Sequence, residues 1–163
     1  MLTINELPGY ARVWIYQADR LLTESEQQFL TEASAQFVAQ WAAHGTPLRA
    51  SAQVLNGYFL VLGVDEAQAE ASGCSIDKSV HFVKGLGSQL NIDFFNRLNL
   101  AVEMPEIQLV PLSQFENLVA NGTITPDTYV YDNTVTKAED FTGRWHTKAS
   151  NTWLSRYFTK QTA

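Results

Sequence analysis

The pattern of apolar and polar residues divides this chain into short runs typical of strands and longer stretches typical of helices. Residues 12–16, Arg-Val-Trp-Ile-Tyr, are mostly β-branched or aromatic and predict a first strand. Thr23 and Glu26 then have the spacing of a helix capping box. Behind this box, bulky or small apolar residues recur at every fourth position, on one stripe of a helix: Phe29, Ala33, Phe37 and Trp41. We expect this helix to end at His44-Gly45, with His44 near its C-terminal cap.

Residues 47–65 predict two strands joined at Asn56-Gly57, the dipeptide that tolerates both positive φ angles of a type I′ turn. The second arm, residues 58–64, is almost entirely apolar, which is typical of a central strand covered on both faces. A loop of small residues follows, and a second helix is expected from about Ser75. Its buried face is marked by Ile76, Val80, Val83, Leu86 and Leu90.

The rest of the chain has weaker patterns. Residues 98–112 predict one further extended stretch, in which Pro105 favours an edge position or a bulge. Ser113 and Glu116 repeat the capping-box spacing and predict a short helix that ends at Gly122. Residues 128–131 predict a last strand, and no single structure is indicated from Thr136 onward.

The order of these elements predicts an α+β fold with a ferredoxin-like βαββαβ core, an antiparallel sheet with both helices on one face, followed by a helix, a strand and a tail. We therefore expect one domain over residues 1–135. Residues 136–163 form an aromatic tail that carries five basic and two acidic residues, so that it is net +3 and the remainder is net −9. We expect this tail to pack on the domain or on a partner subunit, in a homo-oligomer.

Composition excludes several classes of function. An acidic body argues against nucleic acid as a partner, because phosphate binding needs clustered Lys and Arg. The start of the chain has no secretion signal and no run is long enough for a membrane span, so we expect a cytoplasmic protein without membrane contact. No P-loop is present, which argues against a nucleotide-hydrolysing ATPase. The single cysteine and the spacing of His44, His81 and His146 predict neither a metal site nor a cofactor.

The expected topology brings two distant parts of the sequence to one end of the sheet. The first helix ends there, near His44 and Arg49, and the second strand of the hairpin returns there at Asp65. The second helix begins at the same end. Its opening contributes four further candidate residues: Gly73, Cys74, Ser75 and Asp77.

Three interpretations of this rim remain open. Cys74 at a helix N-terminus favours a thiolate, so that Cys74 with His44 as base predicts a thiol-dependent enzyme, with the N–H groups near Ser75 and Ile76 as oxyanion donors. The same N–H groups can instead hold a small anionic ligand without a covalent step, with Arg49, Asp65, Gly73, Ser75 and Asp77 as ligand-binding candidates. In the third interpretation Cys74 is a small buried core residue and the rim has no ligand.

Three stretches together resemble a family of short bacterial proteins, seen chiefly in Bacteroidetes: residues 12–20 (RVWIYQADR), 41–48 (WAAHGTPL) and 73–79 (GCSIDKS). Some members carry the label "ABC transporter ATPase", which nothing in these residues supports. The resemblance implies a bacterial cytosolic protein and supplies no catalytic residues. The leading hypothesis is a non-enzymatic binding or assembly domain, and the alternative is the thiol enzyme.

Overall fold

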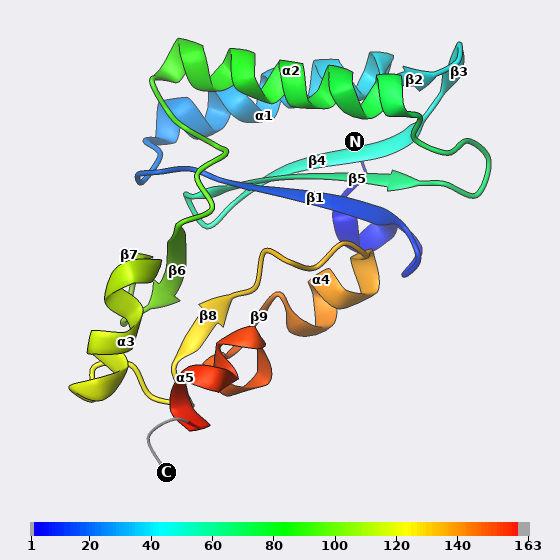
Figure 1. Cartoon of the computed structure of the whole chain (residues 1–163). Helices are drawn as coiled ribbons and strands as arrows, with labels where there is room; N and C mark the ends of the chain where they lie inside the picture. The colour runs from blue at the N-terminus through cyan, green and yellow to red at the C-terminus, as the bar shows by residue number, and fades with distance from the viewer. Residues whose placement is uncertain (1, 160–163) are drawn as a thin grey trace. The chain divides into compact units, whose positions relative to one another are not determined.

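The computed structural model describes residues 2–159 and has an α+β fold made of two compact units (Figure 1). Unit 1 comprises the described residues up to Phe95 together with Thr136–Thr142, and unit 2 comprises Asn96–Val135 together with the described residues from Gly143. The sequence-based division at residue 135 differs from this, because the chain enters unit 2 after Phe95 and returns briefly to unit 1 at Thr136.

Unit 1 holds the longer helices and a three-stranded antiparallel sheet. Its elements are η1 (Ile4–Glu6), β1 (Arg12–Gln17), α1 (Glu24–Gln40), β2 (Ala42–Ala43), β3 (Thr46–Pro47), β4 (Arg49–Leu55), β5 (Phe59–Asp65), α2 (Gly73–Leu90) and the start of α4 (Ala138–Arg144). The strand order in the sheet is β1-β5-β4, and α1 and α2 lie side by side over one face (Figure 1). No helix in the described part of the chain has the length and apolar character that crossing a membrane requires.

The central strand β5 is buried at all seven positions, as its apolar sequence predicts. Its second face is covered by the N-terminal segment. A Cβ atom at Gly63 would lie only 2.7 Å from Cδ1 of Ile4 and 2.8 Å from Cδ1 of Leu7, so glycine is needed there for close packing. The Asn56-Gly57 turn is also confirmed, with φ angles of 55° and 74° and a hydrogen bond from the N–H of Tyr58 to the carbonyl of Leu55.

Among the described residues of unit 1, the sheet has no fourth strand of a ferredoxin-like fold, so that finer prediction is not confirmed. Residues 98–112 do not form one strand beside β1. They form a hairpin, β6 (Asn99–Glu103) and β7 (Ile107–Pro111), with Pro105 in the connecting turn, and this hairpin belongs to the sheet of unit 2. The free edge of β1 instead receives a short contact from the returning chain, in which the N–H of Val13 donates to the carbonyl of Thr136.

Helix α1 has the predicted capping box, in which the N–H of Glu26 donates to the side chain of Thr23, but it ends at Gln40. The prediction that His44 caps this helix is therefore wrong. Ala42–Ala43 and Thr46–Pro47 pair as a short hairpin, and His44-Gly45 forms its two-residue turn with φ angles of 50° and 80°. Positive φ at two successive residues gives a type I′ turn, which connects two strands tightly.

Unit 2 is built on a second antiparallel sheet with the order β7-β6-β8-β9, where β8 is Tyr129–Tyr131 and β9 is His146–Lys148. Helix α3 (Leu112–Ala120) begins directly after β7, without a side-chain cap, so the capping box predicted at Ser113 is wrong. The described tail also includes η2 (Ala149–Asn151), η3 (Trp153–Ser155) and α5 (Arg156–Thr159). Two of its aromatic residues pack within the unit: Trp145 is buried, and the ring centroid of Tyr157 lies 4.9 Å from that of Phe115.

Candidate functional site

The rim of unit 1 where α2 begins is formed by the β2–β3 hairpin and the loop between β5 and α2 (Figure 1). The loop is fixed by the two acidic residues that end and follow β5. The N–H of Ala67 donates to Oδ1 of Asp65 at 3.0 Å, and the N–H of Ala71 donates to Oε2 of Glu66 at 2.8 Å. These local hydrogen bonds hold the backbone of the loop in a defined path up to the helix.

Helix α2 opens with Ser72 as its N-cap residue. The N–H of Ser75 donates to Oγ of Ser72 at 3.1 Å, and the hydroxyl of Ser75 donates back to the carbonyl of Ser72 at 2.8 Å. Ser75 is buried, so its side chain serves this cap and faces no ligand. Gly73 and Cys74, the first two residues of the helix, are exposed, and no other atom lies within 4 Å of a Cβ placed on Gly73.

A single hydrogen bond connects this opening to the end of α1. The indole Nε1–H of Trp41 donates to the carbonyl of Ser75 at 2.9 Å, and both residues are almost fully buried. Trp41 is also held by the rings of Phe37 and Trp14, whose centroids lie 5.2 Å and 5.9 Å from its own. Because Trp41 directly precedes β2, this contact fixes the hairpin beside the helix opening.

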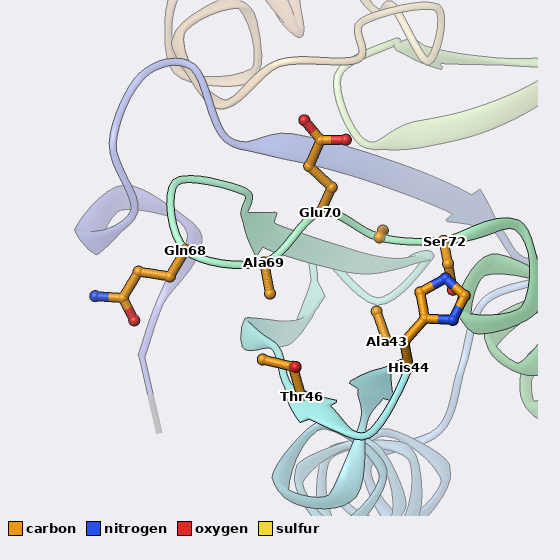
Figure 2. A pocket seen from close by; sticks show the side chains of 8 residues that line it. Ala43, His44, Thr46, Gln68, Ala69, Glu70 and Ser72 are labelled. Atoms are coloured by element: carbon orange, nitrogen blue, oxygen red, sulfur yellow. The ribbon is translucent and has the colours of Figure 1, made fainter.

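His44 and Ser72, which are far apart in the sequence, line one pocket of about 340 Å³ at this rim (Figure 2). The other lining residues come from the hairpin and from the loop: Ala43, Thr46, Gln68, Ala69, Glu70 and Ala71. Figure 2 shows the imidazole of His44 beside Ser72, whereas the carboxylate of Glu70 points away from both. The expectation that His44 lies at the α2 opening therefore agrees with the geometry, although a hairpin turn and not a helix end places it there.

Arg49 and Asp65 form a separate pair on neighbouring strands. Nη1 of Arg49 lies 3.6 Å from Oδ2 of Asp65, whose side chain is only 8% exposed, and neither residue lines the pocket. Tyr10 joins this pair. Partial burial, followed by the charge of Asp65 and hydrogen bonding to it, raises the pKa of Tyr10 above its ordinary value, while Arg49 acts in the opposite direction. The negative charge of the buried Asp65 carboxylate is thus compensated by the positive charge of Arg49 and by the hydrogen bond with Tyr10.

The remaining candidates lie on the exposed surface of α2. Cys74 is an exposed free thiol, so the interpretation of Cys74 as a small core residue is wrong. It does not line the pocket that contains His44, and Asp77 is exposed in the second turn. The structure thus brings His44 to the opening of α2, and pairs Arg49 with Asp65, without joining these two groups in one cavity.

The electrostatics of the two helix openings differ. The first turn of α1 contains Glu24 and Glu26, which complement the positive end of the helix dipole. The first turn of α2 contains no acidic residue. Because the first N–H groups of a helix have no partner within it, the opening of α2 can accept negative charge from outside the helix. In the described part of the chain, no group of three or more His, Cys, Asp and Glu residues has a geometry suited to a metal ion.

Comparisons of this chain with protein-family models, with curated proteins and with solved structures found no match. The resemblance to the short bacterial family stays a prediction.

The sequence reasoning missed Tyr10 and most of the pocket lining. The position of Tyr10 depends on the register of β1 on β5, in which Arg12 lies opposite Val64 and the residues just before Arg12 approach Asp65. The sequence pattern alone does not give this register. The lining residues Thr46, Gln68 and Glu70 gave no signal. Thr46 belongs to the hairpin that the sequence did not predict, and Gln68 and Glu70 are ordinary residues of the loop between β5 and α2.

Proposed function

We propose that this protein is a non-enzymatic binding domain that holds a small anion, a carboxylate or a phosphate, at the opening of α2. The observation that carries the proposal is the shared pocket of His44 and Ser72 at the start of an 18-residue helix whose first turn lacks acidic residues. A helix N-terminus presents free N–H groups and a positive partial charge, and both favour an anion.

Each group at the rim has a distinct part in this account. Gly73 and Cys74 directly follow the pocket residue Ser72 in the chain, and in this account their N–H groups donate to an anion at the mouth of the pocket. The missing side chain of Gly73 gives the ligand access to the backbone. A ring N–H of His44 adds a charge-assisted hydrogen bond to the anion from the hairpin turn. Ser72 and Ser75 hold the helix start in place through their mutual hydrogen bonds, and so they are positioning residues.

The first test is calorimetric titration with inorganic phosphate and with citrate near pH 6. We expect saturable binding that weakens by roughly tenfold or more in His44→Gln, because one charge-assisted hydrogen bond is lost. His81→Gln is the matched control, because His81 is also an exposed histidine but lies two turns further along α2. Absence of binding in the wild type, or equal loss in both variants, would overturn the proposal.

The thiol-dependent enzyme is the second candidate, and the exposure of Cys74 favours it. In that account Cys74 is the nucleophile and His44 the base. Alkylation of the native protein separates the two candidates: thiolate reactivity that is already high near pH 6 and falls in His44→Gln supports the enzyme. In the binding account Cys74→Ser leaves phosphate affinity unchanged, because the ligand contacts the backbone at this position.

A further inference from the structure

A groove of about 470 Å³ runs between α1 and α2 on their outer side, away from the rim pocket. Its apolar lining includes Phe29, Ala33 and Phe37 from α1 and Phe82 and Leu86 from α2. The rings of Phe37 and Phe82 stack at 4.3 Å with an interplanar angle of 6°. None of its lining residues is Lys, Arg, Asp or Glu, and protein–protein interfaces have the same combination of aromatic enrichment and charge depletion at their centre.

Gly85 lies in this groove, at a position where the described part of the chain does not require glycine. No atom lies within 4 Å of a Cβ placed on it, and glycine inside a helix is destabilising relative to alanine. Gly87, two residues later, is the opposite case, because a Cβ there would collide with the backbone carbonyl oxygen of Ile92. The open position at Gly85 lets an outside surface approach the backbone of α2 closely.

The two helices of this face carry opposite charge. Within its bounds α1 contains three glutamates and no basic residue, although Glu26 is paired with Arg20 just before the helix, whereas α2 contains Lys78 and Lys84 against the single acidic residue Asp77. A face with one acidic and one basic helix is complementary to a second copy of itself when α1 of one copy lies on α2 of the other. This charge complementarity selects a second copy as the occupant of the groove.

We infer that two copies of this chain meet through the α1–α2 face, with a two-fold axis along the groove. The helices are antiparallel, since the end of α1 contacts the start of α2 through Trp41 and Ser75, while Arg20, before α1, donates to the carbonyl of Leu90 at the end of α2. The stack of Phe37 on Phe82 sets their alignment.

Glu32 lies five residues before Phe37 in α1, and Gly87 lies five residues after Phe82 in α2. Because the helices are antiparallel and aligned at the Phe37–Phe82 stack, Glu32 and Gly87 lie at the same position along the helix axes. Measured along the helix axes, the two-fold axis therefore places Glu32 of one copy within one helix turn of Lys84 on α2 of the other. The ammonium of Lys84 also lies 5.4 Å from the ring centroid of Phe95 in its own copy. The geometry makes the pair of Glu32 and Lys84 the main test of the arrangement.

Sedimentation equilibrium of the full chain over a wide concentration range tests the inference. We expect a monomer–dimer equilibrium, whose dissociation constant rises at least about 100-fold in Gly85→Glu, because that charge is buried without a partner at the centre of the interface. Gly143→Glu is the matched control, because Gly143 is also an exposed helical glycine with nothing within 4 Å of an added Cβ. A melting temperature for Gly85→Glu at or above that of the wild type, with both measured at a concentration where they are monomeric, shows that the fold is intact.

The charge pair has its own experiment. Glu32→Lys is expected to weaken the dimer and the double variant Glu32→Lys, Lys84→Glu to restore it, whereas Glu116→Lys on α3 makes the same charge change without effect. A wild type that is monomeric at every concentration, or a dimer that tolerates Gly85→Glu, overturns the interface. A dimer that is lost in Gly85→Glu but not restored by the double variant overturns the pairing of α1 with α2.

Discussion

The indole N–H of Trp41 donates to the backbone carbonyl of Ser75 at 2.9 Å, in the interior of unit 1. This hydrogen bond spans the region between the end of the first long helix and the first turn of the second. It lies directly behind the rim where the turn residue His44 meets the N-cap residue Ser72. The position of the pocket therefore depends on a buried contact that contains none of the pocket's own residues.

Replacing Trp41 with phenylalanine removes this donor and part of the buried ring. We expect a loss of about 1–3 kcal/mol in the free energy of unfolding, from the lost hydrogen bond and the small cavity together. Phosphate affinity is expected to fall as well, because the hairpin is no longer held against α2. Urea unfolding and calorimetric titration of the same variant measure the two effects.

Trp14→Phe is the control for this variant, since Trp14 packs on Trp41 from β1 and, among the described residues, has no side-chain hydrogen bond to the α2 opening. It should lower stability while phosphate binding is retained. If Trp41→Phe lowers stability and leaves binding intact, the rim does not depend on the Trp41 contact.

Acid stability depends on Glu26 at the start of α1. A bidentate pair with Arg20, with N···O distances of 2.8 Å and 2.7 Å, and the capping hydrogen bond from the N–H of Thr23 lower the pKa of Glu26 to about 2. A carboxyl group with a lowered pKa stabilises the fold above its unfolded-state pKa, and this contribution is lost as the pH falls toward 2. Glu26→Gln keeps a capping-box residue but removes the charge, so it should melt below the wild type at pH 7.

The difference between wild type and Glu26→Gln should shrink steadily below about pH 4.5 and vanish only at a pH below 2, where both side chains are neutral. Thermal melts across this pH range measure it. Glu24→Gln is the control from the same first turn, because Glu24 has no ion pair in the described part of the chain. A difference for Glu26→Gln that stays constant with pH would show that the Arg20 pair does not lower this pKa.

Tyr10 reports on the buried charge of Asp65. Burial is the first cause of its raised pKa and Asp65 is the second, so Asp65→Asn should move the titration of Tyr10 to lower pH without restoring it fully. The chain has six tyrosines, so the signal of Tyr10 is the difference in tyrosinate absorbance between each protein and its Tyr10→Phe derivative. An unchanged or higher pKa in Asp65→Asn would contradict this arrangement.

Much of unit 1 follows from local patterns. The capping box at Thr23, the Asn56-Gly57 turn and the apolar run of β5 each act through neighbouring residues, and each is found where the sequence predicts it. The rim follows from the same elements, because alternating chain direction returns the end of α1 and the start of α2 to one end of the sheet. That argument needs only the element order.

The elements that the sequence did not predict depend on contacts with residues that are far away in the sequence. His44-Gly45 suits a helix end and a type I′ turn equally well, and the turn is formed because Trp41 leaves the helix to reach Ser75. Residues 98–112 are apolar enough for a strand beside β1, but they fold back on themselves at Pro105 and pair with β8. Strand partners of this kind are chosen by tertiary packing, which a local pattern does not record.

The NMR spectrum of the backbone amide groups, recorded during titration with inorganic phosphate, tests the anion site most directly. The account predicts saturable shifts that are largest for the backbone N–H groups of Gly73 and Cys74 and that weaken strongly in His44→Gln, with little change at Glu24 in the acidic opening of α1. Shifts that are absent at Gly73 and Cys74, or that are equally large at both helix openings, would contradict it.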